Sequence, residues 1–147
     1  MAVEKIQVVG AGQMGSGIAQ VAAQAGLSVY LSDVDEEAIE KGLETIKKHL
    51  ARSVEKERIS QDEMDEALER IESGTEYAPD ADLAIEAVVE TIEAKKEVFR
   101  ALRPYKSQHY DVVTLTTLEC SVFYRVSRPA ATHRLLLQSV QPLLCEI

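Results

Sequence analysis

The sequence of 147 residues has little of what several classes of protein require. It contains no tryptophan, two cysteines and no Cys-x-x-Cys pair, which leaves nothing for a disulfide scaffold or a structural zinc site. It lacks a run of about 18 consecutive apolar residues, so no membrane-spanning helix is expected, and its first residues lack the pattern of a secretory signal. Basic side chains are also scarce, since 16 Lys and Arg stand against 25 Asp and Glu. This balance argues against nucleic-acid binding. We expect one metal-free domain in a reducing, cytoplasmic setting.

What is present is distributed unevenly along the chain. Residues 1–100 hold 22 acidic and 11 basic side chains, whereas residues 101–147 hold 3 acidic and 5 basic ones. All seven glycines lie at or before Gly74, and both cysteines lie after it. The composition therefore changes near Arg103–Pro104, although no Gly/Ser linker marks a domain boundary there.

The first part of the chain has the pattern of a strand, a helix and a second strand. Residues 5–9 form a short apolar run rich in β-branched side chains, which indicates a buried strand. Apolar residues recur at helical spacing over residues 12–25, and Gly26 ends that helix. Residues 27–31 predict the second strand. Such a βαβ unit joins parallel strands by a right-handed crossover.

The remaining pattern extends this unit into a larger α/β layout. We expect a long amphipathic helix over residues 36–58, a helix that begins at the capping box Ser60–Glu63 and reaches Ile71, a strand over 83–89, a helix over 93–102 and a strand over 110–116. The predicted fold class is α/β, a Rossmann-type doubly wound parallel sheet with a helical insertion after the second strand.

The turn after the first strand carries a dinucleotide-binding pattern. Gly10-Ala-Gly12-Gln13-Met14-Gly15 matches G-x-G-x-x-G, and Asp33 follows 23 residues after Gly10, at the end of the second strand. The first glycine permits the tight turn, the second leaves room for a pyrophosphate, and the third allows close packing of helix and strand. Asp33 suits ribose hydroxyls, and the acidic residues after it favour NAD(H) over NADP(H). The alternative is that the glycines only form a turn and that Asp33 caps the next helix.

The sequence around this motif resembles one enzyme family. Residues 8–20, Val-Val-Gly-Ala-Gly-Gln-Met-Gly-Ser-Gly-Ile-Ala-Gln, are similar to the opening of L-3-hydroxyacyl-CoA dehydrogenases, including bacterial 3-hydroxybutyryl-CoA dehydrogenases. The likeness continues through Asp33, Lys41–Gly42, Ser53–Ser60, Asp80–Glu90 and Lys95. The run Ala-Asp-Leu-x-Ile-Glu-Ala-Val-Val-Glu is its most specific part, because most Rossmann domains lack it. The same run speaks against a 3-hydroxyisobutyrate-type dehydrogenase.

The resemblance implies NAD-dependent oxidation of an L-3-hydroxyacyl-CoA to the 3-oxoacyl-CoA. It also implies a separate helical C-terminal domain through which the family dimerises. Glu90 and Lys95 match positions that the family uses around the nicotinamide half of the cofactor, whereas local sequence alone favours a solvated helix charge for Lys95. The long helix is similar to a family insertion that contacts CoA. Its Lys47, Lys48 and Arg52 suit either CoA phosphates or simple solvation.

The family's catalytic pattern is only partly present. The family uses a substrate-binding serine, a general-base histidine in His-Phe-x-Asn-Pro and a glutamate that orients the histidine. Aligned without a gap, Thr117 falls at the serine position. His133 is the nearest histidine and Glu146 resembles the glutamate, but matching them requires small deletions, and the Phe-x-Asn-Pro sequence is absent. A surface histidine is therefore the alternative for His133.

Two hypotheses for function follow from these residues. The first is a 3-hydroxyacyl-CoA dehydrogenase, present as its NAD-binding Rossmann domain over residues 1–147, with 1–102 family-like, 103–147 divergent and the helical domain absent. The second is an NAD(H)-binding module without turnover. Four explanations for residues 103–147 stay open: truncation, an altered reading frame, a degenerate relative, or a binding module with a new tail.

Overall fold

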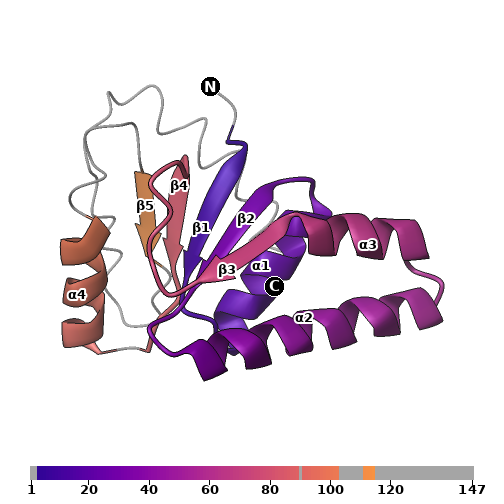
Figure 1. Ribbon diagram of the computed structural model, residues 1–147, viewed down its shortest axis with the longest axis horizontal. Coiled ribbons are helices and arrows are strands. Elements are labelled where there is room, and N and C mark those ends of the chain that lie inside the picture. The colour runs from indigo at the N-terminus through magenta and orange to yellow at the C-terminus, as the bar shows by residue number, and fades with distance from the viewer. Residues whose placement is uncertain (1–2, 90, 103–110, 115–147) are drawn as a thin grey trace.

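The structure is a computed structural model that describes residues 3–89, 91–102 and 111–114 (Figure 1). The described strands form one parallel sheet of five strands in the order β3-β2-β1-β4-β5. The strands are β1 (Lys5–Val9), β2 (Ser28–Ser32), β3 (Ile71–Gly74), β4 (Leu83–Glu86) and β5 (Asp111–Thr114). The helices are α1 (Gln13–Gln24), α2 (Glu36–Glu55), α3 (Gln61–Glu69) and α4 (Ile92–Leu102).

All five strands are parallel, but the order in which the chain adds them to the sheet changes side at β1. The chain passes outward from β1 to β2 and β3, and then returns to place β4 on the other side of β1, followed by β5. This confirms the predicted doubly wound fold with a helical insertion, α2 and α3, after the second strand. In such sheets ligands bind outside the carboxyl ends of the strands, at the point where the order reverses. The carboxyl ends of β1 and β4 meet there, since Val9 is in register with Glu86.

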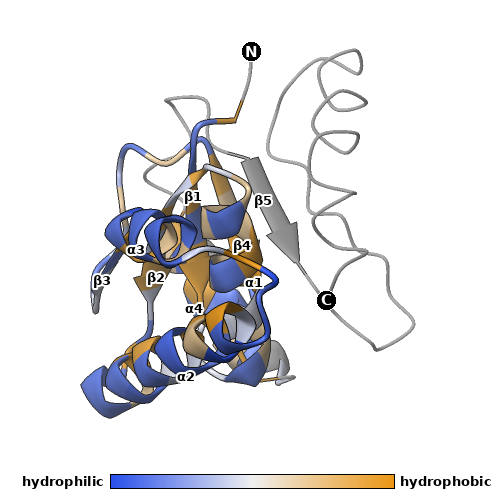
Figure 2. Ribbon diagram, turned by 90° about the vertical axis from the view of Figure 1, so that its right-hand side faces the viewer, coloured by the Kyte–Doolittle hydropathy of each residue, from blue (hydrophilic) through white to orange (hydrophobic). Residues whose placement is uncertain are grey.

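Alternating strand residues supply a core on each face of the sheet. Val8, Leu31 and Ile85 belong to a buried cluster that includes residues of α1, α2 and α3. On the opposite face, Val9 and Ala84 belong to a second cluster that includes Val98 and Leu102 of α4. The strands β1, β2 and β4 are accordingly coloured as hydrophobic, whereas most of α2 and α3 is hydrophilic (Figure 2). The sheet is therefore covered by helices on both faces.

The helical insertion is fixed by its caps. Asp35 caps α2 by accepting a hydrogen bond from the backbone N–H of Glu37. The predicted capping box of α3 is confirmed, since Ser60 and Glu63 exchange side-chain-to-backbone hydrogen bonds. α2 ends at Glu55, three residues before the predicted end, and Glu57 adopts a left-handed φ of 55° that a helix cannot continue through. The two helices run side by side beyond the β3 edge (Figure 1).

The sequence interpretation of Ile71 was wrong. The helical pattern that included Ile71 ends earlier, at Glu69, and Ile71 instead opens β3 as the register partner of Val29. Ile71–Gly74 carries too few apolar residues to show a strand pattern of its own. Pairing with β2 therefore decides its conformation, because tertiary context overrides local propensity.

One predicted strand, residues 83–89, is shorter in the structure. β4 ends at Glu86, although the apolar run continues to Val89. Ala87 still donates to the carbonyl of Val9, at 2.8 Å, but the N–H of Val88 turns to the Glu86 carboxylate. The chain thus leaves the ladder at this point. The described part of the last strand is Asp111–Thr114, inside the predicted range 110–116.

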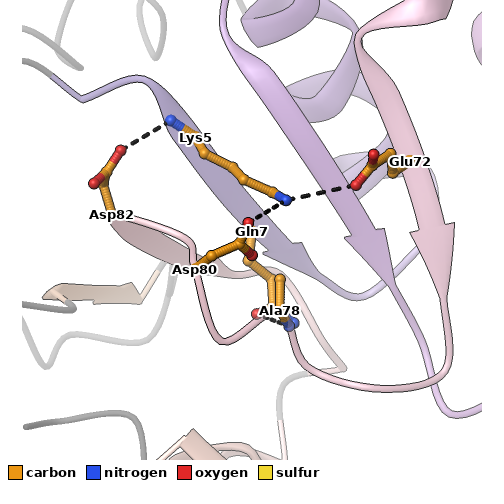
Figure 3. Close-up of polar contacts among 6 residues, drawn as sticks. All are labelled: Lys5, Gln7, Glu72, Ala78, Asp80 and Asp82. Atoms are coloured by element: carbon orange, nitrogen blue, oxygen red, sulfur yellow. Dashed lines mark hydrogen bonds and ion pairs between the residues drawn. The ribbon is translucent and has the colours of Figure 1, made fainter. Parts of the chain in front are cut away.

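Polar groups tie the amino ends of β1 and β4 together (Figure 3). The Asp82 carboxylate accepts hydrogen bonds from the backbone N–H groups of Glu4 and Lys5. The ammonium of Lys5 lies 2.8 Å from an Asp80 carboxylate oxygen and 3.5 Å from one of Glu72. The hydrogen bond from Lys5 holds the pKa of Asp80 below its ordinary value of 3.8, and the same bond raises the pKa of Lys5 above 10.5. These contacts stabilise the amino edge of the sheet, which is opposite the carboxyl edge.

We expect Asp80→Asn to remove a small, pH-dependent part of the stability. Because the pKa of Asp80 is lowered on folding, its contribution is present above pH 3.8 and is lost as the pH falls through the folded value. Asp80 is largely exposed, so the loss near neutral pH should stay below about 1 kcal/mol. Urea denaturation across pH measures the difference between the two proteins. In a Lys5→Met background the same substitution should show a much smaller pH dependence, because the largest cause of the lowered pKa is removed, and a pH dependence of undiminished size would contradict the assignment.

Candidate dinucleotide-binding site

The glycine loop joins β1 to α1 at the switch point of the sheet. Gly10 has a φ of +106°, which side chains rarely tolerate, and its N–H donates to the carbonyl of Ser32 at 2.7 Å. A Cβ added to Gly10 would lie 2.6 Å from the carbonyl oxygen of Ala87. A Cβ on Gly15 would collide with the carbonyl oxygen of Gly10. Both glycines are therefore required by the protein itself, for the turn and for close packing of α1.

Gly12 differs from both of these glycines. A Cβ added there would meet no protein atom within 4 Å, so packing within the described residues does not exclude a side chain. Gly12 is the N-cap of α1, where it supplies no capping side chain, and the first turn of α1 holds no acidic residue. α2 and α3, in contrast, begin with capping side chains and acidic first turns. A helix start of this kind offers its N–H groups and dipole to an anion such as a pyrophosphate.

Asp33 supports the loop rather than the next helix. One of its carboxylate oxygens accepts a hydrogen bond from the N–H of Ala11 at 2.8 Å, and the other accepts from the N–H of Asp35 at 3.2 Å. The alternative in which Asp33 caps α2 is wrong, because the N-cap is Asp35. The half-buried Asp33 carboxylate thus lies next to the glycine loop, with lone pairs left for hydroxyl groups of a ligand.

A glycine that sequence reasoning did not select holds the loop from the other side. Gly42 is buried in α2, and a Cβ there would lie 2.7 Å from the carbonyl oxygen of Ala11. Ala11 is 3% exposed, between this helix and the Asp33 carboxylate. The signal in the sequence is a single glycine inside a long helical pattern, a position that usually has a packing reason.

Apolar side chains flank the same edge of the sheet. Among the described residues, the exposed large hydrophobic side chains are Met14, Val34 and Val89. Met14 follows the glycine loop, Val34 follows Asp33, and Val89 follows β4. Gln13, predicted from the fingerprint together with Met14, is also exposed at the start of α1. Met14, Val34 and Val89 are thus exposed apolar side chains that follow the glycine loop, β2 and β4.

The ammonium of Lys95 is not a solvated helix charge. Its side chain is 17% exposed and lies 2.9 Å from a carboxylate oxygen of Glu86, which is fully buried. Glu86 also accepts a hydrogen bond from the N–H of Val88 at 2.8 Å. Sequence reasoning missed Glu86, although a carboxylate within a buried strand is an available signal, since buried charges are paired. The pair lies at the carboxyl end of β4, next to the loop.

Four predicted site residues, Glu90, Thr117, His133 and Glu146, lie outside the described residues. Lys47, Lys48 and Arg52 are exposed on α2. The part of the chain that the structure describes contains no group of three or more His, Cys, Asp or Glu side chains that could hold a metal ion. It also contains no helix long and apolar enough to cross a membrane.

A doubly wound parallel sheet, a glycine loop that opens α1 and an acidic residue after β2 define a dinucleotide-binding Rossmann domain. The family model described as 3-hydroxyacyl-CoA dehydrogenase, NAD binding domain, matches residues 5–123. The chain belongs to this family, and its cofactor class is NAD.

Individual relatives agree with the family match. The chain is 47% identical over 104 residues to a probable 3-hydroxybutyryl-CoA dehydrogenase of Bacillus subtilis, which covers 69% of this chain and 36% of that protein. It is 42% identical over 102 residues to the 3-hydroxybutyryl-CoA dehydrogenase of Bradyrhizobium diazoefficiens, covering 68% and 35%. The crystal structure of the enzyme from Escherichia coli matches with a TM-score of 0.75 and 31% identity over 80% of this chain and 25% of that one. The chain thus spans about a third of the length of the curated relatives it matches.

Proposed function

We propose that this chain is the cofactor-binding part of an NAD-dependent L-3-hydroxyacyl-CoA dehydrogenase, with a substrate such as 3-hydroxybutyryl-CoA. The observation that carries the cofactor half of this proposal is the open space over Gly12, at an uncapped helix start, next to the Asp33 carboxylate. When bound, NAD supplies the acceptor for the hydride that leaves the hydroxyl-bearing carbon. The acyl-CoA substrate and the cytoplasmic location rest on the likeness to the family.

The residues around the loop would share the binding of the dinucleotide. The N–H groups at the start of α1 would bind the pyrophosphate, and the Asp33 carboxylate would accept hydrogen bonds from the ribose hydroxyls of the adenosine half. A 2′-phosphate would meet the carboxylates of Asp33, Asp35 and Glu36, and the first arginine in the sequence is Arg52. These charges support NAD(H) over NADP(H).

The catalytic assignments rest on the family pattern. His133 would take the proton from the substrate hydroxyl, Glu146 would orient its imidazole, and Thr117 would hydrogen-bond the substrate. Glu90 and Lys95 would lie at the nicotinamide half of the cofactor. The family resemblance also supports a helical domain C-terminal to the NAD-binding domain. We propose that the whole protein dimerises through that domain.

The second candidate is an NAD(H)-binding module without turnover. The observation that favours it is that His133 and Glu146 lie beyond residues 5–123, which the family model matches, and that the Phe-x-Asn-Pro sequence is absent after His133. NADH titration should show binding under both proposals. Acetoacetyl-CoA-dependent oxidation of NADH should appear only under the first, and activity that survives His133→Ala would show that the base is misassigned.

We expect Gly12→Ala to weaken NADH binding at least about tenfold while the domain stays folded. The added Cβ meets no atom of the described residues within 4 Å, so the free energy of unfolding should change by less than about 1 kcal/mol. Fluorescence titration with NADH and urea denaturation give the two quantities.

The matched control for this test is Gly17→Ala, also open to an added Cβ but inside α1. Its NADH affinity should equal that of the wild type, and its stability should rise by about 0.5–1 kcal/mol. Unchanged NADH binding in Gly12→Ala would remove the assignment of the pyrophosphate site.

A further inference from the structure

The carboxylate of Glu86 takes no part in the contacts proposed above, yet it lies at the same edge of the sheet. Glu86 is the last residue of β4, and its side chain is fully buried. In the register of the sheet its neighbours are Val9, which precedes the glycine loop, and Thr114, at the end of β5. Glu86 therefore marks the β4–β5 side of the switch point.

Within the described residues, this carboxylate has one charged partner. That partner is Lys95, the fourth residue of α4. The Lys95 ammonium lies 2.9 and 3.3 Å from its two oxygens. Packed apolar side chains of similar volume often stabilise a fold as well as a buried ion pair does. Stability alone therefore does not explain a buried ion pair at this position. The location of the Glu86–Lys95 pair suggests its role instead.

The Glu86–Lys95 pair lies on the side of the site that would bind the nicotinamide half of the dinucleotide, an inference that rests on the proposed function. With the adenosine ribose at Asp33 on β2 and the pyrophosphate at Gly12, the rest of the molecule extends across β4 and β5, because dinucleotides cross the crevice at the switch point. The ring of that half carries a positive charge in NAD⁺ and none in NADH. An unpaired ammonium on this side would therefore disfavour the oxidised form selectively.

We propose that Glu86 is a positioning residue that neutralises Lys95 and holds its ammonium at the nicotinamide side, so that the site accepts the cationic ring of NAD⁺. Lys95 then offers hydrogen-bond donors at this edge, while the charges of the Lys95–Glu86 pair sum to zero. The Glu86 carboxylate is itself fixed by the N–H of Val88, at 2.8 Å, so the pair is tied to the backbone beside the loop.

The test is the ratio of the dissociation constants for NAD⁺ and NADH, measured by calorimetric titration of the full chain at constant pH and ionic strength. In Glu86→Gln, we expect the ratio to rise about tenfold, mainly through weaker binding of NAD⁺. The double variant Glu86→Gln/Lys95→Met removes both charges and should restore the ratio to within about twofold of the wild type. The matched control is Glu93→Gln, which removes the partner of the exposed Lys96 on the same helix and should leave the ratio unchanged.

An unchanged ratio in Glu86→Gln, or equal weakening of both nucleotides, would overturn the proposal, as would a shifted ratio in the double variant. If circular dichroism shows that Glu86→Gln is unfolded, Glu86→Met makes the same charge change with a side chain better suited to burial. A wild-type chain that bound neither nucleotide would overturn the proposed function and this inference with it. A wild-type chain that binds both, with no change of ratio in the variants, would overturn this inference alone.

Discussion

Gly15→Ala is expected to cost at least about 3 kcal/mol of the free energy of unfolding, or to prevent folding. The added Cβ would collide with the carbonyl oxygen of Gly10 and would also approach a methyl group of Val8 to 3.5 Å. The carbonyl belongs to backbone, which has no alternative rotamer, and Gly10 is itself held by its hydrogen bond to Ser32. Neither partner can therefore move without opening the loop. Urea denaturation followed by circular dichroism measures the loss.

Gly17→Ala is the matched control for this prediction as well. It introduces the same methyl group two residues further along α1, where a Cβ meets no atom within 4 Å in the part of the chain that the structure describes. If the two variants were equally stable, the close packing of α1 on the loop would not be a constraint on this fold.

Lys95→Met is expected to destabilise the domain by about 3–5 kcal/mol, more than Glu86→Gln. The two members of the pair differ in their access to water, since the Lys95 side chain is 17% exposed and that of Glu86 is fully buried. An unpaired Lys95 remains partly hydrated where it stands, whereas an unpaired Glu86 keeps an uncompensated charge in the interior. Denaturant midpoints of the two single variants test this order directly.

The double variant Glu86→Gln/Lys95→Met supplies the control for this second prediction. It leaves no uncompensated charge, so it should be more stable than Lys95→Met alone, and the difference gives the coupling between the two side chains. Additive losses, with no recovery in the double variant, would show that the pair does not act as a unit.

The parts of the fold that local pattern specifies were predictable from the sequence. Lys5–Val9 was expected as a strand and forms β1, and the Ser60 capping box starts α3 as expected. The glycine pattern was informative because it combines the turn at Gly10, the close contact of Gly15 with the carbonyl of Gly10 and the open position at Gly12. Such signals are contained in short stretches of chain, where residue type and spacing determine conformation.

The features that escaped prediction depend on contacts between distant segments. Ile71 was assigned to a helix because its strand exists only through pairing with β2. Glu86 was overlooked because its partner, Lys95, lies nine residues away on α4, and only the fold shows that both are withdrawn from water. Gly42 was noted only within the family likeness, since its reason is the approach of α2 to Ala11. The placement of the catalytic candidates remains a prediction.

The contact between Gly42 and Ala11 divides the helical insertion into two regions with different freedom to vary. Gly42 lies within the first two turns of α2, and the helix continues to Glu55, about 20 Å further on. The near region contacts the glycine loop at Ala11, so a bulkier residue at position 42 must displace the loop. The far region can be lengthened, shortened or recharged without reaching the loop. Related domains can therefore remodel the outer end of this helix pair while position 42 stays closed to any side chain.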